Sequence, residues 1–229
     1  AGGGMGACGA DGPAGSGAGR GGRELQAARA TVALLSLATL VIYADRVGFS
    51  IAFTEIAKSA RLEQTAKGAV LSAFFYGYCC TQIPAAWLVS RLGPRPVLAS
   101  AVGAGALLAL ACPSAVEPAE GGAPLWLFAA VRVLVGCSQG AVFPCVHTEL
   151  ARQREVFGSG SFSAVVAVAT SGMYLGSAGA MGVFPAVSAA GVPLVFRLQG
   201  TLGMAWLALW GWMCVRYAPV VAKGEGVGA

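Results

Sequence analysis

Residues 132–147 read R-V-L-V-G-C-S-Q-G-A-V-F-P-C-V-H and lie inside an apolar segment that begins at Pro124. An apolar helix of about 20 residues crosses a bilayer core about 30 Å thick, so Arg132 falls within a predicted span. An ionised side chain at that depth costs at least about 2.5–3.5 kcal/mol unless it faces a watery cavity or the interior of a helix bundle. Gln139 returns to the same helix face seven residues later. The stretch therefore predicts a membrane helix bundle with a polar interior.

The composition of the whole chain agrees with this prediction. Of its 229 residues, 56% are hydrophobic and only 11% are charged, against about 25% charged in ordinary soluble domains. The net charge of +5 is scattered between apolar segments, whereas a nucleic-acid surface needs a basic stripe on one face. We therefore expect the lipid bilayer as a partner and no nucleic acid.

Six apolar segments predict an all-α membrane protein with six transmembrane helices. The expected spans are about residues 28–57, 67–88, 97–111, 124–150, 162–183 and 192–217. Residues 1–28 are rich in Gly and Ala and predict a disordered head, residues 29–217 the bundle, and residues 218–229 a tail. Trp206, Trp210, Trp212 and Tyr217 near the end of the last span predict an aromatic belt at the membrane interface.

The basic residues between the spans predict the orientation of the chain in the membrane. One side has Arg20, Arg23, Arg29, Arg91, Arg95, Arg152, Arg154, Arg216 and Lys223. The other side has only Lys58, Arg61 and Lys67. Cytoplasmic loops are enriched in Lys and Arg, so both termini should face the cytoplasm. The first residue is not Met, and we expect a fragment or a processed product.

The six spans divide into three and three, and spans one and four then correspond. Each has an arginine in mid-span, Arg46 and Arg132. A rise of 1.5 Å per residue places both in the same half of the bilayer. Inverted repeats of this kind, with a binding site near the midplane, are typical of secondary transporters. Two guanidiniums facing one cavity suit an oxyanion such as a carboxylate or phosphate.

Two structural alternatives remain open for these polar residues. Arg46 could pair with Asp45 or with another buried acid, although adjacent residues point about 100° apart on a helix. The side chains that could either line the cavity or bridge helices are Tyr43, Tyr78, Gln82 and Tyr174.

Four pieces of the chain carry a family resemblance. They are Y-A-D-R-V-G-F-S-I-A (43–52), L-S-A-F-F-Y-G-Y-C-C-T-Q-I-P (71–84), R-V-L-V-G-C-S-Q-G-A-V-F-P-C-V-H-T (132–148) and S-G-M-Y-L-G-S (171–177). In order and spacing they resemble the anion:cation symporter branch of the major facilitator superfamily, and within it the plant type-4 phosphate transporters.

The resemblance implies a six-helix N-terminal bundle of a facilitator fold, built as a 3+3 inverted repeat, with a second six-helix half missing from this chain. It also implies transport of inorganic phosphate or an organic anion, coupled to protons or sodium. Arg46 and Arg132 match the family's substrate-anion arginines, Tyr43 a substrate contact and Asp45 a coupling carboxylate. No cofactor is implied beyond co-transported H⁺ or Na⁺, and the membrane would be that of the Golgi or of a plastid.

The chain departs from the family pattern at span four. Many proton-coupled relatives have Glu where this chain has Gln139, and an amide does not exchange a proton near neutral pH. Asp45 is then the main titrating candidate, or sodium is the driver, with Gln139 kept as a candidate coupling residue.

The cytoplasmic turn after span two matches the family only in part. It has Ala86 and Ser90 where Gly and Asp are usual, and it keeps Arg91, Gly93 and Arg95. Arg91 and Arg95 are therefore candidate gating residues.

Gly136-Cys137-Ser138-Gln139-Gly140 also fits G-x-S-x-G, the serine-hydrolase elbow, which requires a strained strand-to-helix turn. The histidine nearest to it, His147, lies nine residues from Ser138, about 13 Å along a helix, too far for a hydrogen bond. We expect no enzyme. His147 is either a gating residue in a wetted cavity or a structural residue at a helix end. Three functions remain, in decreasing order: anion symporter, inactive truncated bundle and intramembrane hydrolase.

Overall fold

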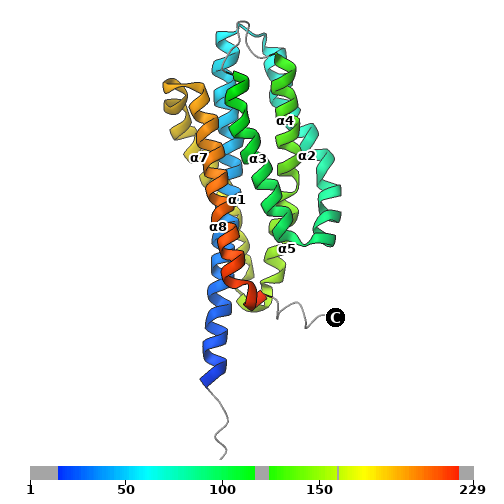
Figure 1. Ribbon diagram of the computed structural model, residues 1–229, viewed down its shortest axis with the longest axis vertical. Coiled ribbons are helices and arrows are strands. Elements are labelled where there is room, and N and C mark those ends of the chain that lie inside the picture. Colours follow the sequence, from blue (N-terminus) through cyan, green and yellow to red (C-terminus); the bar gives the residue numbers. More distant parts are fainter. Residues whose placement is uncertain (1–14, 117–123, 159, 222–229) are drawn as a thin grey trace, which may run out of the picture.

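Long helices run up and down the length of the molecule in the computed structural model, which describes residues 15–116, 124–158 and 160–221 (Figure 1). The helices are α1 (Gly15–Ser59), α2 (Gln64–Leu92), α3 (Pro94–Val116), α4 (Leu125–Gly140), α5 (Val142–Arg152), α6 (Arg154–Phe157), α7 (Phe162–Ala190) and α8 (Val192–Val221). Among these residues the chain is helical, with short turns and no strand. The all-α prediction is confirmed, and every expected span overlaps one helix or, for the fourth, two.

The predicted disordered head differs from the structure. Helix α1 begins at Gly15, so residues 15–28, for which we expected no structure, are helical. Ala27 and Ala28 are buried against the bundle, and extending an existing helix is much easier than nucleating one. Residues 1–14 of the head and 222–229 of the tail lie outside the described residues.

The fourth span is interrupted, which the sequence reading did not anticipate. Helix α4 ends at Gly140 and α5 begins at Val142. Pro144 in the first turn of α5 has no N–H to donate to the carbonyl of Gly140. The two helices therefore meet at Ala141, two residues after Gln139 and close to the site residues.

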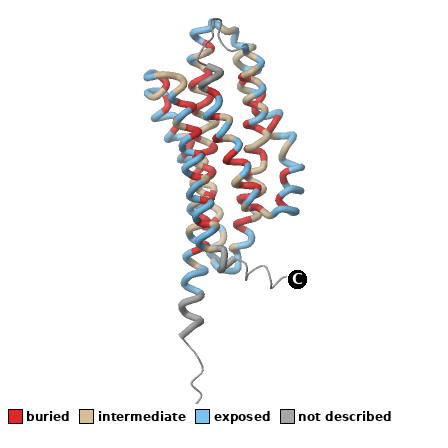
Figure 2. The backbone as a smooth tube through the Cα atoms, in the orientation of Figure 1, coloured by how far each residue is buried: buried red, intermediate tan, exposed pale blue. Residues whose placement is uncertain are grey.

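Within the described residues, five of the six expected spans are long and apolar enough to cross a membrane, namely Gly21–Ser59, Pro94–Cys112, Leu125–Arg152, Phe162–Ala190 and Val192–Tyr217. Helix α2 is not among these five, although it has 29 residues and also runs along the bundle (Figure 1). Polar residues such as Ser72, Thr81 and Gln82 lower its hydropathy. Much of its surface is exposed (Figure 2).

The helix contacts have the symmetry expected of an inverted repeat. Helix α1 packs most extensively on α7, α2 packs on α4, and α3 packs on α8. Exchanging α1–α3 with α4/α5, α7 and α8 turns the first pair into the second and leaves the third unchanged. The contacts of α1 with α8 and of α4 with α3 exchange in the same way. The predicted 3+3 arrangement thus describes how the helices pack.

Glycines permit close contact in the two most extensive helix pairs, α1 with α7 and α2 with α4. A Cβ on Gly136 of α4 would lie on the carbonyl oxygen of Phe74 in α2, and one on Gly172 of α7 would lie on that of Ser36 in α1. Small residues at such crossings let backbones approach within van der Waals contact. Because α2 and α4 approach closely here, the ring of Phe74 in α2 can contact the side chain of Arg132 in α4.

The predicted aromatic belt is wrong for two of its three tryptophans. Trp206 and Trp210 are buried, with rings stacked 5.2 Å apart between centroids. Their indole N–H groups donate to the carbonyls of Leu34 in α1 and Arg95 in α3. The two rings fill the space between α1, α3 and α8, whereas Trp212 is exposed.

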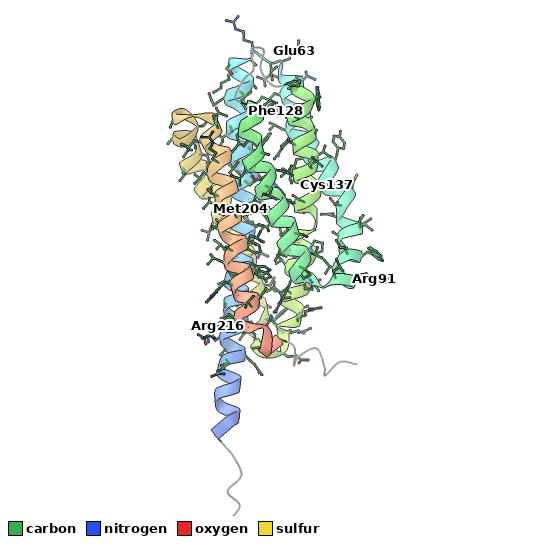
Figure 3. The ribbon with its side chains drawn as sticks, in the orientation of Figure 1. Glu63, Arg91, Phe128, Cys137, Met204 and Arg216 are labelled. Atoms are coloured by element: carbon green, nitrogen blue, oxygen red, sulfur yellow. The ribbon has the colours of Figure 1, made fainter. Side chains whose placement is uncertain are left out.

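Charge is distributed unevenly between the two ends of the bundle. Arg91 and Arg216 lie toward one end and Glu63 lies at the other (Figure 3). At the Arg91 end, Gly93 closes α2 with φ of 83°, a left-handed conformation that favours glycine, and Pro94 starts α3. The tight basic turn predicted from the sequence is therefore present.

Candidate functional site

Arg46 of α1 lies against three aromatic rings. Its guanidinium carbon is 4.7 Å from the ring centroid of Tyr43, 4.4 Å from that of Phe74 and 5.5 Å from that of Tyr78. Tyr43 is one turn before Arg46 on the same helix, and the other two rings come from α2. Guanidiniums over ring faces are stabilised by about 0.5–2 kcal/mol per contact, more when desolvated. The faces of three aromatic rings thus stabilise the positive charge of Arg46 in the middle of α1.

Arg132 of α4 is buried, with only 2% of its surface exposed. Its guanidinium carbon lies 4.2 Å from the ring centroid of Phe49 in α1 and 4.8 Å from that of Phe74. The two arginines, which are 86 positions apart in the sequence, therefore contact the same Phe74 ring.

The shared ring limits the separation of the two charges. Since both guanidinium carbons lie within 4.8 Å of one centroid, they are at most about 9 Å apart. Phe74 reaches this position because Gly77, one turn further along α2, lets the backbones meet at the carbonyl of Val133. Like charges at about 9 Å repel by about 2 kcal/mol at an effective dielectric constant of about 20. An anion in contact with both guanidiniums would remove this repulsion.

Neither guanidinium is neutralised by an acid in hydrogen-bonding contact. Nε of Arg46, and Nε and Nη1 of Arg132, are buried without a hydrogen-bond partner. Among residues 21–112, 124–158 and 160–217, the side-chain ion pairs include Lys58–Glu55 and Arg95–Glu149. Neither of the two mid-span arginines forms an ion pair within these ranges. Buried, unsatisfied donors of this kind are uncommon. They are the donors that an oxyanion would accept from.

Asp45 points to another side of α1, as the helix geometry predicted. Gln139 Nε2 donates to Asp45 Oδ2 at 2.8 Å, and Gln199 Nε2 of α8 donates to the Asp45 carbonyl at 3.0 Å. Asp45 interacts electrostatically with Arg132 and Arg46. It also lines a cavity of about 10 Å³ together with Arg132. The carboxylate of Asp45 thus contacts Gln139 of α4, whereas the guanidinium of Arg46 contacts the aromatic rings of α2.

The remaining predicted cavity residues are less closely connected. His147 packs 6.1 Å from Phe143, whose ring is 6.3 Å from that of Tyr43, so an aromatic path joins it to Arg46. Gln82 is exposed and 70% of Tyr174 is exposed. No contact among the described side chains joins either of them to an arginine, and their substrate-binding role stays a prediction.

The predicted gating arginines lie at the basic end of the bundle. Arg91 is over the ring of Trp87, at 5.4 Å. Arg95 donates from Nε and Nη2 to Oε1 of Glu149 at 2.9 and 2.7 Å, and Glu149 also accepts from Gln153. Glu149 is buried, so this ion pair ties the start of α3 to the end of α5. Their gating role stays a prediction.

The sequence reading missed four residues that complete these contacts: Phe49, Phe74, Glu149 and Gln199. Both phenylalanines lie in apolar runs, where nothing distinguishes a ring beneath a cation from an ordinary packing residue. Gln199 and Glu149 could have been found, because each is a polar residue inside a predicted span.

The serine-hydrolase elbow is absent at Ser138. This residue lies within α4 and its hydroxyl donates to the carbonyl of Val135, an ordinary helix contact. Nδ1 of His147 is hydrogen-bonded to the carbonyl of Phe143. Neither geometry supports a nucleophile with its base.

Comparison with known proteins agrees with this geometry. The family profile of the Major Facilitator Superfamily matches residues 35–228. Probable anion transporter 5 of Arabidopsis thaliana is 39% identical over 195 residues, covering 85% of this chain and 42% of the relative. Probable anion transporter 6 of Oryza sativa subsp. japonica is 41% identical over 182 residues, covering 79% and 40%.

The name of one chloroplastic relative includes dependence on sodium. Sodium-dependent phosphate transport protein 1 of Arabidopsis thaliana is 32% identical over 180 residues, covering 78% of this chain and 34% of the relative. The chain thus spans about two-fifths or less of the length of these curated relatives.

Proposed function

The chain belongs to the Major Facilitator Superfamily, and on that basis we propose that its helices form one half of a secondary active transporter for inorganic phosphate or an organic anion. The proposal includes coupling to a proton or sodium ion and a second six-helix half that completes the path. Relatives named as anion and phosphate transporters support the anionic substrate.

One observation carries the proposal, the pair of arginines on the Phe74 ring. Both guanidiniums are at least partly buried and keep Nε without a hydrogen-bond partner. An anion bound between them would accept from these donors and remove their mutual repulsion. In the proposed cycle Arg46 and Arg132 bind the solute, and Tyr43 and Tyr78 orient the guanidinium of Arg46.

The direction of the chain in the membrane follows from its charge. Arg91 and Arg216 lie toward the end where the described chain starts and ends (Figures 1 and 3). We assign this end to the cytoplasmic side, because loops rich in Lys and Arg remain there. Relatives named as chloroplastic support an organelle membrane, with the Golgi as the alternative.

A chimera tests the proposal. The chain replaces its matching segment in Probable anion transporter 5, and uptake of ³²P-phosphate is measured in proteoliposomes. Arg132→Ala should lower uptake at least about tenfold, because one charge-assisted hydrogen bond is worth about 1.5–3 kcal/mol. Arg29→Ala is the matched control, since Arg29 is an exposed arginine of the same bundle.

Uptake of organic anions by the chimera identifies the substrate class. Wild-type uptake by Arg132→Ala would overturn the anion-binding role of the arginines. A correctly inserted chimera that moves no anion would favour the inactive bundle.

A further inference from the structure

A small cavity lies on the inner side of α1, away from the aromatic rings that hold Arg46. It measures about 20 Å³ and is lined by residues of α1, α3, α4 and α8, among them Asp45, Gln139 and Gln199. A volume of about 10–15 Å³ on this measure already holds one water molecule. The cavity therefore has room for a single particle of that size.

The two glutamines direct their donors to Asp45 and keep their acceptors free. Nε2 of Gln139 binds the carboxylate and Nε2 of Gln199 binds the Asp45 carbonyl. Oε1 of each glutamine is buried without a partner, and both side chains are only 4% exposed. Leaving one such oxygen unsatisfied costs about 1–3 kcal/mol. Gly48 leaves room for Gln199, because a Cβ there would collide with its amide.

Among the polar residues that line this cavity, the buried atoms without a hydrogen-bond partner are the two amide oxygens. One carboxylate and two amide carbonyls are hard ligands, which suit hard cations such as Na⁺ better than soft metal ions. A glutamine at position 139 cannot exchange a proton as a glutamate can, but its oxygen can coordinate a cation. The same replacement that weakens the case for proton coupling thus leaves a ligand for an ion.

The charges near the cavity favour a cation only when an anion is also present. Arg46, Arg132 and ionised Asp45 together have a net charge of +1, and all three interact electrostatically. Binding of a dianion such as hydrogen phosphate changes the total to −1, and one monovalent cation then returns it to zero. Each ion should therefore raise the affinity for the other, by the same factor.

We propose that Asp45, Gln139 and Gln199 bind one Na⁺ ion, and that this ion is co-bound with a dianionic solute on Arg46 and Arg132. The site rests on the proposed function for its coupling to the anion, and on the carboxylate and the two free amide oxygens for its existence. It names Gln199 of α8 as a cation ligand.

Binding of ²²Na⁺ to the purified chain in nanodiscs tests the site. The assay is run at constant pH and ionic strength, with choline replacing Na⁺, and with or without inorganic phosphate. Phosphate should raise the Na⁺ affinity about tenfold, within the usual range of such couplings. Gln199→Met should lower Na⁺ binding at least about tenfold, whereas Gln199→Glu should keep it. Gln64→Leu, at an exposed glutamine, is the matched control.

The outcomes separate the cation site from the anion site. Na⁺ binding that is absent in the wild-type chain, or equal in Gln199→Met and Gln64→Leu, overturns the proposal and leaves water or a proton on Asp45 as the occupant. ³²P-phosphate binding that requires Arg132, in a chain that shows no Gln199-dependent Na⁺ binding, keeps the anion site and overturns the cation site. Na⁺ binding that requires Gln199 but ignores phosphate supports the cation site and counts against the proposed function. Fluorescence of buried Trp206 and Trp210 verifies that each variant is folded.

Discussion

Replacing Phe74 with leucine should destabilise the bundle far more than the same change at the next residue. Phe74 is fully buried and lies within 4.8 Å of both guanidinium carbons. Phe75 is 55% exposed and has no cation over its ring among the described side chains. The pair therefore compares the same substitution with and without the two arginines.

The expected magnitude follows from the interactions of the phenyl ring that a leucine side chain cannot make. Two partly desolvated cation–π contacts are worth about 1–2 kcal/mol each. Poorer packing of leucine in the space of a phenyl ring adds about 1 kcal/mol. Phe74→Leu should thus lower the free energy of unfolding by about 3–5 kcal/mol, and Phe75→Leu by less than about 1 kcal/mol.

Unfolding of the chain in mixed micelles, followed by tryptophan fluorescence, measures these differences. A double-mutant cycle with Arg46→Met isolates the ring–cation contact, because residues in direct contact couple by about 0.5–3 kcal/mol. A coupling near zero between Phe74→Leu and Arg46→Met would refute the claim that the ring stabilises the cation. Equal losses of stability at positions 74 and 75 would refute it independently.

Two further predictions concern the frame around the site. Gly77→Ala should lower the unfolding midpoint, because the added methyl group overpacks against α4 at a cost of about 1–3 kcal/mol. Gly179→Ala is the control and should leave the midpoint unchanged or raise it, because the space around its Cα is open. Equal midpoints for the two variants would contradict the close contact between α2 and α4. Glu149→Ala should cost about 3 kcal/mol in the same assay, because it leaves the largely buried Arg95 without its acid, and exposed Glu155→Ala is its control.

The order of the spans could be predicted, because five of the six are apolar runs of sufficient length to cross a membrane. The repeat could be predicted because Arg46 and Arg132 occupy corresponding spans. The interruption of the helix at Ala141 was missed, since Pro144 was read within a continuous apolar segment. The burial of Trp206 and Trp210 was missed for another reason. An indole at a span end fits an interfacial belt and a helix contact equally well, and only the carbonyls of Leu34 and Arg95 decide between them.

For the site, sequence reasoning identified the charges but not their surroundings. Arg46, Arg132 and Asp45 stand out because ionisable residues are costly in apolar spans. Phe74 is one apolar residue among many in its span, and its role depends on the crossing of α2 with α4. The packing of the helices determines which side chains contact a charged group. These contacts cannot be read directly from a single sequence.

The neighbouring positions 45 and 46 would let one helix contact both the proposed anion and the proposed Na⁺ ion. Their side chains leave α1 about 100° apart, so Arg46 reaches the aromatic rings of α2 while Asp45 reaches Gln139 on the inner side. Arg132 joins the two sides, because it contacts Phe74 and also lines a cavity with Asp45. An anion that binds Arg132 weakens the field that Arg132 exerts on the carboxylate, and the carboxylate then attracts a cation more strongly. Coupling of this kind requires no helix movement at the moment of binding. In the proposed transporter, conformational change would be needed only afterwards, to open the neutralised site to the other side of the membrane.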